Sequence, residues 1–201
     1  MADDDDVRTL LQGRDYAAAL TLTIRSYGPE VFGWLTAQLR DAEQAREAFA
    51  WFAEDLWNSL RNFRGECSVR TWAYAVARNS LRRFRERGRA GQLDGVVLSE
   101  VSRASVLMVA PITSDSHFTK ERKLDLIERL RGELDEEDQA LLTLRVDKGL
   151  NWREVATVLH FEGTLPSEDV LAREEARLRK RFQLVKDKLR KLAQEELASR
   201  L

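Results

Sequence analysis

A run of arginines on one predicted helix constrains this chain more than any other feature of its sequence. Residues 61–89 hold nine arginines and two acidic residues, a net charge of +7 in a 201-residue chain whose net charge is −1. The spacing predicts a helix over residues 68–87, with Ser68 as its N-cap and glycines at positions 65 and 88 around it. Small and apolar side chains share one arc of this helix, which predicts a core-facing side made of Val69, Trp72, Ala73, Val76, Ala77, Ser80 and Phe84.

The opposite side of the same helix is cationic and polar, with one tyrosine. It comprises Thr71, Tyr74, Arg78, Arg82 and Arg85. Cations pair with phosphates and aromatic rings stack on unpaired bases, so this side is a candidate nucleic-acid interface. A solvated helix held by surface ion pairs is the alternative. Such helices usually mix charges of both signs, and the scarcity of acids here favours nucleic-acid contact.

Charge alternates in blocks along the chain. The net charge is −6 over residues 1–60, +7 over 61–89, −5 over 120–170 and +6 over 171–192. Two basic segments, each preceded by an acidic one, indicate two modules that each present one basic element. Residues 90–119 contain glycine, proline and many serines and valines without helical periodicity, which predicts a linker. We therefore predict an all-α chain of two small helical domains, residues 1–89 and 120–201, joined by a flexible linker over 90–119.

Helical periodicity accounts for most of the first module. The sequence predicts helices over residues 17–27 and 29–39, or one broken helix, and a further helix over residues 42–60. Three tryptophans of this half, Trp34, Trp57 and Trp72, are expected in the core. Trp51 lies far from the apolar stripe of its helix, which suits a contact with a partner. The acidic residues 3–6 are expected to form a disordered tail.

The second module reads as a helix-turn-helix followed by one long helix. Apolar spacing predicts a helix that ends near Leu134, a second that starts at Asp135, and a third capped by Asn151 and Glu154. After a loop over residues 160–167, a last helix starts at Ser167 and carries a narrow apolar seam. Its other side is basic and suits the major groove, where Arg and Lys reach guanine and Gln reaches adenine. A charged helix in an oligomeric coiled coil is the alternative.

Composition and missing motifs argue against several classes of protein. One cysteine cannot form an intrachain disulfide, and two histidines with one cysteine cannot build a usual zinc site. No apolar run approaches the ~18 residues of a membrane span. The acidic N-terminus has the wrong sign for a signal peptide. The chain lacks a phosphate-binding glycine loop, a nucleophile elbow and a zinc-protease motif. We expect a cytoplasmic protein that is not an enzyme and uses no cofactor and no metal.

Two stretches carry specific motifs. The first contains LW at 56–57, LRNFRG at 60–65, TWAYAVARN at 71–79 and RR at 82–83. The second contains LD at 134–135, LL at 141–142, GLNWREVA at 149–156, RF at 181–182 and KLR at 188–190. They resemble regions 2 and 4 of the extracytoplasmic-function sigma factors, small bacterial relatives of sigma-70 that direct RNA polymerase to promoters. The resemblance covers about residues 17–88 and 120–195, and residues of about 160–176 are additional to the family's usual spacing.

The resemblance implies a set of partners and contacts. Residues 1–88 would bind the clamp helices of the RNA polymerase core and open the −10 element of promoter DNA, and residues 120–195 would read the −35 element. The implied −10 contacts are Arg61, Asn62, Arg64, Ser68, Arg70, Thr71, Tyr74, Arg78, Asn79, Arg82 and Arg85. The implied −35 contacts are Arg173, Arg177, Arg179, Lys180, Arg181 and Gln183. The implied polymerase contacts are Glu47, Trp51, Glu54 and Asp55.

Two other classes of function stay open at the level of the sequence. One is a stand-alone helix-turn-helix regulator that binds DNA without polymerase. The other is a helical adaptor whose basic faces bind acidic partners. The family resemblance also leaves an anti-sigma factor open as a further partner.

Overall fold

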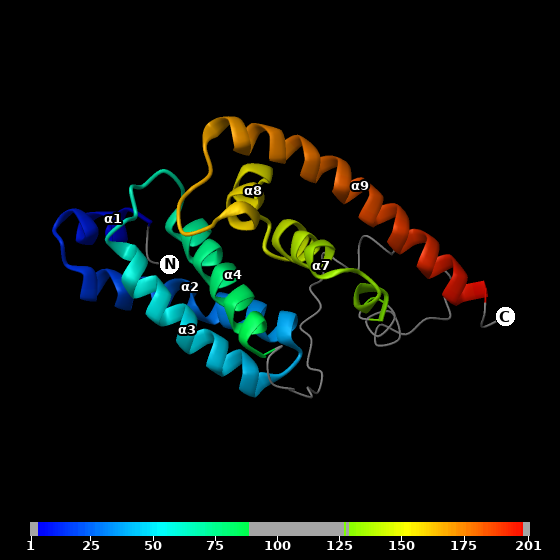
Figure 1. Cartoon of the computed structure of the whole chain (residues 1–201), viewed down its shortest axis with the longest axis horizontal. Helices are drawn as coiled ribbons and strands as arrows, with labels where there is room; N and C mark the ends of the chain where they lie inside the picture. The colour runs from blue at the N-terminus through cyan, green and yellow to red at the C-terminus, as the bar shows by residue number, and fades with distance from the viewer. Residues whose placement is uncertain (1–3, 89–126, 128, 199–201) are drawn as a thin grey trace. The chain divides into compact units, whose positions relative to one another are not determined.

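The computed structural model describes residues 4–88, 127 and 129–198 of the chain (Figure 1). Within these residues every element is helical, which confirms the predicted all-α class. The chain divides into two compact units: unit 1 combines residues 1–98 with 156–168, and unit 2 combines residues 99–155 with 169–201. The predicted linker over residues 90–119 lies outside the described residues.

Unit 1 is built on α1 (Asp4–Gln12), α2 (Tyr16–Leu39), α3 (Ala42–Leu60) and α4 (Val69–Gly88). Figure 1 shows α2, α3 and α4 packed side by side. α2 continues through Pro29, where the sequence predicted a break. An internal proline costs about 3 kcal/mol, and the buried side chains on both sides of it offset that cost. Gly28 lets Phe49 of α3 pack closely against α2, because a Cβ at this position would lie only 3.3 Å from Ile24 Cγ2 and 3.4 Å from Phe49 Cζ.

α3 has the predicted bounds because its start is capped by a side chain. Asp41 Oδ1 accepts hydrogen bonds from the backbone N–H groups of Glu43 and Gln44 at 2.8 and 3.1 Å. Its buried stripe comprises Ala45, Ala48, Phe52, Leu56 and Leu60. Trp57 does not join this stripe: it is 37% exposed, so its predicted core position is wrong. Residue 57 lies about 100° around the helix from residue 56, which turns it toward solvent.

α4 begins as predicted, with Ser68 Oγ accepting the backbone N–H of Thr71 at 3.0 Å. All seven residues of the predicted core side are buried. The predicted exposure of Thr71 and Tyr74 is wrong, because residues 71–77 are all buried. α4 packs against α1, α2 and α3 together, so its first half has no open side. The Tyr74 ring meets Trp34 edge to face at a centroid distance of 5.9 Å.

The acidic start of the chain is helical, so the predicted disordered tail is wrong for residues 4–6; residue 3 lies outside the described residues. Asp4 is the reason. Its Oδ2 accepts the backbone N–H of Val69 at 2.8 Å, and its Oδ1 accepts the Tyr27 hydroxyl at 2.9 Å. The Asp4 carboxylate therefore caps the N-terminus of α4 from 65 residues away, where the helix dipole favours a negative charge.

Asp4→Ala is expected to destabilise unit 1 by about 1 kcal/mol, because the first turn of α4 loses its carboxylate partner. Asp5 and Asp6 are exposed members of the same turn of α1. Asp5→Ala and Asp6→Ala are expected to stay within about 0.5 kcal/mol of the parent chain. Denaturant unfolding of the three variants measures this, and equal losses in all three would contradict the capping role.

Unit 2 is stabilised by local caps and by one apolar cluster. It holds the helical residues 127 and 129–132, α7 (Glu136–Leu142), a π-helical turn over Thr143–Asp147, the first turn of α8 (Trp152–His160) and α9 (Glu168–Ala198). The predicted capping box is confirmed: Asn151 N–H donates to Glu154 Oε2 at 2.8 Å, and Glu154 N–H donates to Asn151 Oδ1 at 3.0 Å. The cluster joins the 127–134 segment and α7 to the seam of α9, and comprises Ile127, Leu130, Leu134, Leu142, Val185, Leu189 and Ala193.

Candidate nucleic-acid interface

The loop before α4 carries exposed cations, and hydrogen bonds from Arg8 fix its backbone. Gly65 adopts a φ of +76°, and a Cβ there would lie 2.5 Å from Arg8 Nη1, so this position requires glycine. Arg8 donates to the carbonyl oxygens of Gly65 and Cys67 at 2.9 and 2.7 Å. Arg61 and Arg64 themselves are exposed, together with Asn62. The loop is therefore held from inside while its own arginines face solvent.

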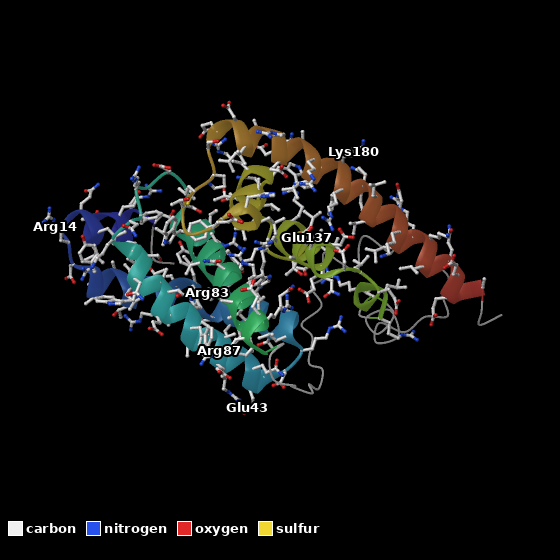
Figure 2. The ribbon with its side chains drawn as sticks, viewed as in Figure 1. Arg14, Glu43, Arg83, Arg87, Glu137 and Lys180 are labelled. Atoms are coloured by element: carbon white, nitrogen blue, oxygen red, sulfur yellow. The ribbon has the colours of Figure 1, made fainter. Side chains whose placement is uncertain are left out.

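The second half of α4 continues this basic surface. Arg82, Arg83 and Arg87 are exposed, and Arg78 and Arg85 are half-buried; Figure 2 labels Arg83 and Arg87 along this stretch. Arg85 donates to Gln38 O at 2.7 Å and Arg83 pairs with Asp55, so both side chains are held within unit 1. We call Arg61 and Arg64 of the preceding loop, together with Arg82 and Arg87 of α4, the α4 basic surface.

Arg82 lies on this surface but is not isolated. Its Nη2 donates to Asn79 Oδ1 at 2.9 Å, and its Nη1 lies 3.8 Å from Glu162 Oε1, in the same unit. Surface ion pairs of this length contribute little, about 0–1 kcal/mol. The guanidinium can therefore exchange Glu162 for a phosphate at small cost.

Arg70, Thr71 and Tyr74 differ from the exposed −10 candidates: Thr71 and Tyr74 are buried, and Arg70 is half-buried. Arg70 pairs with Glu30, with an Nε–Oε2 distance of 3.1 Å, and its guanidinium lies 5.8 Å from the Tyr74 ring centroid. Burial and the negative charge of Glu30 raise the pKa of Tyr74 well above its ordinary value, so the phenol stays neutral. Thr71 and Tyr74 therefore support the core of unit 1 and do not line its open surface, and Arg70 is held by Glu30 beside them.

The predicted polymerase contacts divide into two pairs. Trp51 lies half-buried between the Phe84 ring at 5.8 Å and the Arg87 guanidinium at 5.3 Å, and Asp55 accepts from Ser80 and Arg83. These two side chains link α3 to α4. Glu47 and Glu54 are exposed. Helical spacing places them in one row with Glu43 and Trp57, and we call this row the acidic α3 face.

The outer side of α9 carries most of the predicted −35 residues. Arg173, Arg177, Arg179, Lys180 and Gln183 are all exposed. Two of the arginines make short-range ion pairs along the helix, Arg177 with Glu174 at 3.4 Å and Arg179 with Glu175 at 2.9 Å. Figure 2 shows Lys180 pointing away from α7, where Glu137 lies. The outer side of α9 is thus a second basic surface, in unit 2.

Arg181 is the exception among the predicted −35 residues. It is half-buried and pairs with three carboxylates around the start of α7: Asp135 at 3.1 Å, Glu137 and Asp138. Desolvation acts to lower the pKa of Arg181, but the hydrogen bond to Asp138 and the charges of Asp138 and Glu137 outweigh it and raise the pKa. Arg181 therefore holds α9 against the start of α7.

The same cluster changes the acidity of Asp135. Desolvation acts to raise its pKa, but the hydrogen bond from the Asp138 N–H and the charge of Arg181 lower it below the ordinary value of 3.8. The cap of α7 consequently stays ionised at any pH near neutrality.

Two large apolar side chains are exposed in the described part of the chain, and the sequence did not predict either of them as a surface residue. Leu184 on α9 is 63% exposed and Trp57 on α3 is 37% exposed. Helical spacing alone could have found Leu184, because it lies in the row of Arg177 and Lys180 and outside the apolar seam.

The part of the chain that the structure describes offers no group of three His, Cys, Asp or Glu side chains suited to a metal ion. Within the same ranges, no helix combines the length and the apolar character that crossing a bilayer demands.

Comparison with known proteins gives one informative similarity. No family model and no solved structure matches the chain. The chain is 25% identical over 169 residues to the RNA polymerase sigma-H factor of Pseudomonas aeruginosa, which covers 78% of this chain and 83% of that protein. The matched length exceeds that of either compact unit, so the similarity extends over both. This distant similarity supports a relationship to the sigma-70 family of sigma factors, in keeping with the all-helical architecture.

Proposed function

We propose that this chain is a sigma factor of the extracytoplasmic-function group. It acts in the cytoplasm, binds the RNA polymerase core and directs it to promoter DNA, and it catalyses no reaction of its own. The observation that carries the proposal is the presence of one exposed basic surface in each unit, within a chain whose similarity to a sigma factor extends over both units. Two separate basic surfaces suit two separate DNA elements.

Unit 1 acts on the −10 element in this proposal. Opening the duplex and extruding a base costs a few kcal/mol, which contacts to the single strand must offset. Arg61, Arg64 and Arg82 are positioned to hold phosphates of that strand. Tyr74 is buried, so it is not available for stacking on a base.

Unit 2 reads the −35 element as duplex DNA. The outer side of α9 supplies the cations for the phosphates, and Gln183 supplies an amide that matches the edge of adenine. Arg181 stays with the carboxylates of the α7 start, and its role is to fix the position of α9.

The acidic α3 face is the proposed surface for the polymerase clamp helices. Glu47 and Glu54 offer exposed charge, and Trp57 adds the exposed aromatic ring that is typical of interface hot spots. Trp51 and Asp55 act behind this face by fixing α3 to α4.

Reconstitution with core polymerase tests the function. The purified full-length chain is mixed with core RNA polymerase and a library of promoter fragments, and run-off transcripts are sequenced. We expect the chain to co-purify with the core enzyme and to produce transcripts with defined start sites. DNA binding that is as tight without core enzyme, and no transcript with it, would instead identify a stand-alone regulator.

Arg64→Ala and Arg82→Ala are expected to weaken open-complex formation without lowering the melting temperature. Each substitution removes one cation from the α4 basic surface. The slope of log affinity against log salt is negative, and each lost phosphate contact on a single strand makes it less steep by about 0.7. Permanganate reactivity of the promoter, titrated with salt, measures this effect. Arg25→Ala, which removes an exposed arginine from α2, is the matched control and should leave the slope unchanged. An equal slope in all three variants would remove the α4 basic surface from the mechanism.

A further inference from the structure

Leu184 is an exposed leucine on a helix whose apolar seam is covered. It is 63% exposed, whereas Leu171, Leu178 and Leu189 of the same helix are 5–6% exposed. A single exposed apolar side chain is common on protein surfaces and needs no explanation by itself. The charged side chains around Leu184 are the reason to infer a binding role for it.

Leu184 lies in a row of exposed side chains that is mostly cationic. Residues three or four positions apart share one side of a helix, and this spacing places Arg173, Arg177, Lys180, Asp187 and Lys191 in one row with Leu184, all of them exposed. Lys188 lies at the edge of this row, and its Nζ donates to Glu133 O at 3.1 Å. At 1.5 Å per residue the row extends over about 27 Å. Three cations precede Leu184, and Asp187 and Lys191 follow it.

Such a row matches the chemistry of a DNA groove. The cations toward the ends suit phosphates, and the side chain between them faces the edges of the bases. Leucine has no hydrogen-bond donor or acceptor, so it cannot read the polar groups of a base. The one apolar group in the major groove is the 5-methyl of thymine.

We propose that Leu184 contacts a thymine 5-methyl group in the upstream promoter element and makes the chain prefer thymine at one position. This inference rests on the proposed function and names the base that the α9 surface selects. The mostly cationic flanks favour DNA over an apolar protein partner, because a partner helix that buried Leu184 would meet four cations and one acid in the same row.

The test begins with the holoenzyme formed from the full-length chain and core polymerase. It selects from a library of duplexes with a randomised upstream segment, and each thymine of the selected segment is then replaced singly by deoxyuridine, which lacks only the methyl group. We expect one position at which the replacement lowers affinity about fourfold, the effect of one buried methyl group. Leu184→Ala should bind the thymine and uracil duplexes equally, and Leu184→Met should keep the preference.

Lys180→Ala is the matched control. It removes a neighbouring cation from the same row, so it should weaken the thymine and uracil duplexes by the same factor. Selection of an upstream segment without thymine, equal binding of thymine and uracil at every position, or a preference that survives in Leu184→Ala would each overturn the role of Leu184. In those cases the sigma-factor proposal stands, because the holoenzyme still binds promoters. Failure to form a holoenzyme or to enrich any duplex would overturn both.

Discussion

Trp72→Ala is expected to destabilise unit 1 by about 3–5 kcal/mol, the largest effect of any single substitution considered for this unit. The Trp72 side chain is 3% exposed and lies at the centre of an aromatic cluster. Its ring centroid is 5.3 Å from that of Phe63 and 5.1 Å from that of Phe161, both in edge-to-face geometry. Its Nε1–H donates to Ser59 Oγ at 3.3 Å. Alanine would leave a cavity between the loop before α4, α3 and α4, and would remove one hydrogen bond of the Ser59 hydroxyl, which still donates to Leu56 O.

Trp57→Ala is the matched control, because it removes the same side chain from an exposed position of α3. It should change stability by no more than about 0.5 kcal/mol. A chain of two units need not unfold in one transition, so the protection of α3 and α4 amides against hydrogen exchange is the appropriate measurement. Similar losses of protection in the two variants would show that Trp72 is not central to this core. In Trp57→Ala, a loss of core-polymerase affinity at unchanged protection would support the acidic α3 face.

Arg181→Ala is expected to destabilise unit 2 by about 2–4 kcal/mol. Removing one partner of a buried ion pair leaves an uncompensated charge, which typically costs about 3–5 kcal/mol; we expect somewhat less because part of the cluster is exposed. Asp138 would be left as the uncompensated charge, since it is buried and pairs with Arg181. Lys180→Ala, one residue away and exposed, should leave stability unchanged and weaken DNA binding.

Acid pH provides a second readout for Arg181. The pKa of Asp135 is lowered in the folded chain, so its contribution to stability is complete above about pH 4 and is lost as the pH falls through the folded value. Without Arg181 that pKa moves up toward its ordinary value. The stability gap between Arg181→Ala and the parent chain should therefore narrow between neutral pH and pH 3, as measured by urea unfolding. A gap that is independent of pH would mean that Arg181 acts through packing alone.

Much of this architecture was predictable because it depends on neighbours close in the sequence. The bounds of α3, the Ser68 cap, the capping box at Asn151 and the apolar seam of α9 all follow from side-chain spacing within one or two turns. The basic side of α9 and the exposed arginines around α4 follow from the same periodicity. These features need no knowledge of how the helices pack, because helical geometry sets which side chains share a side.

The tertiary structure decided what each side chain does once the helices meet. Periodicity placed Tyr74 and Thr71 on an open side, but both are buried because α4 packs against α1, α2 and α3. Asp4 became a helix cap through the N–H of Val69, and Arg181 became an internal cation through carboxylates more than forty residues away. Burial and ion pairing depend on which surfaces approach each other in space, and a helical pattern specifies the direction of a side chain but not the neighbour that it meets.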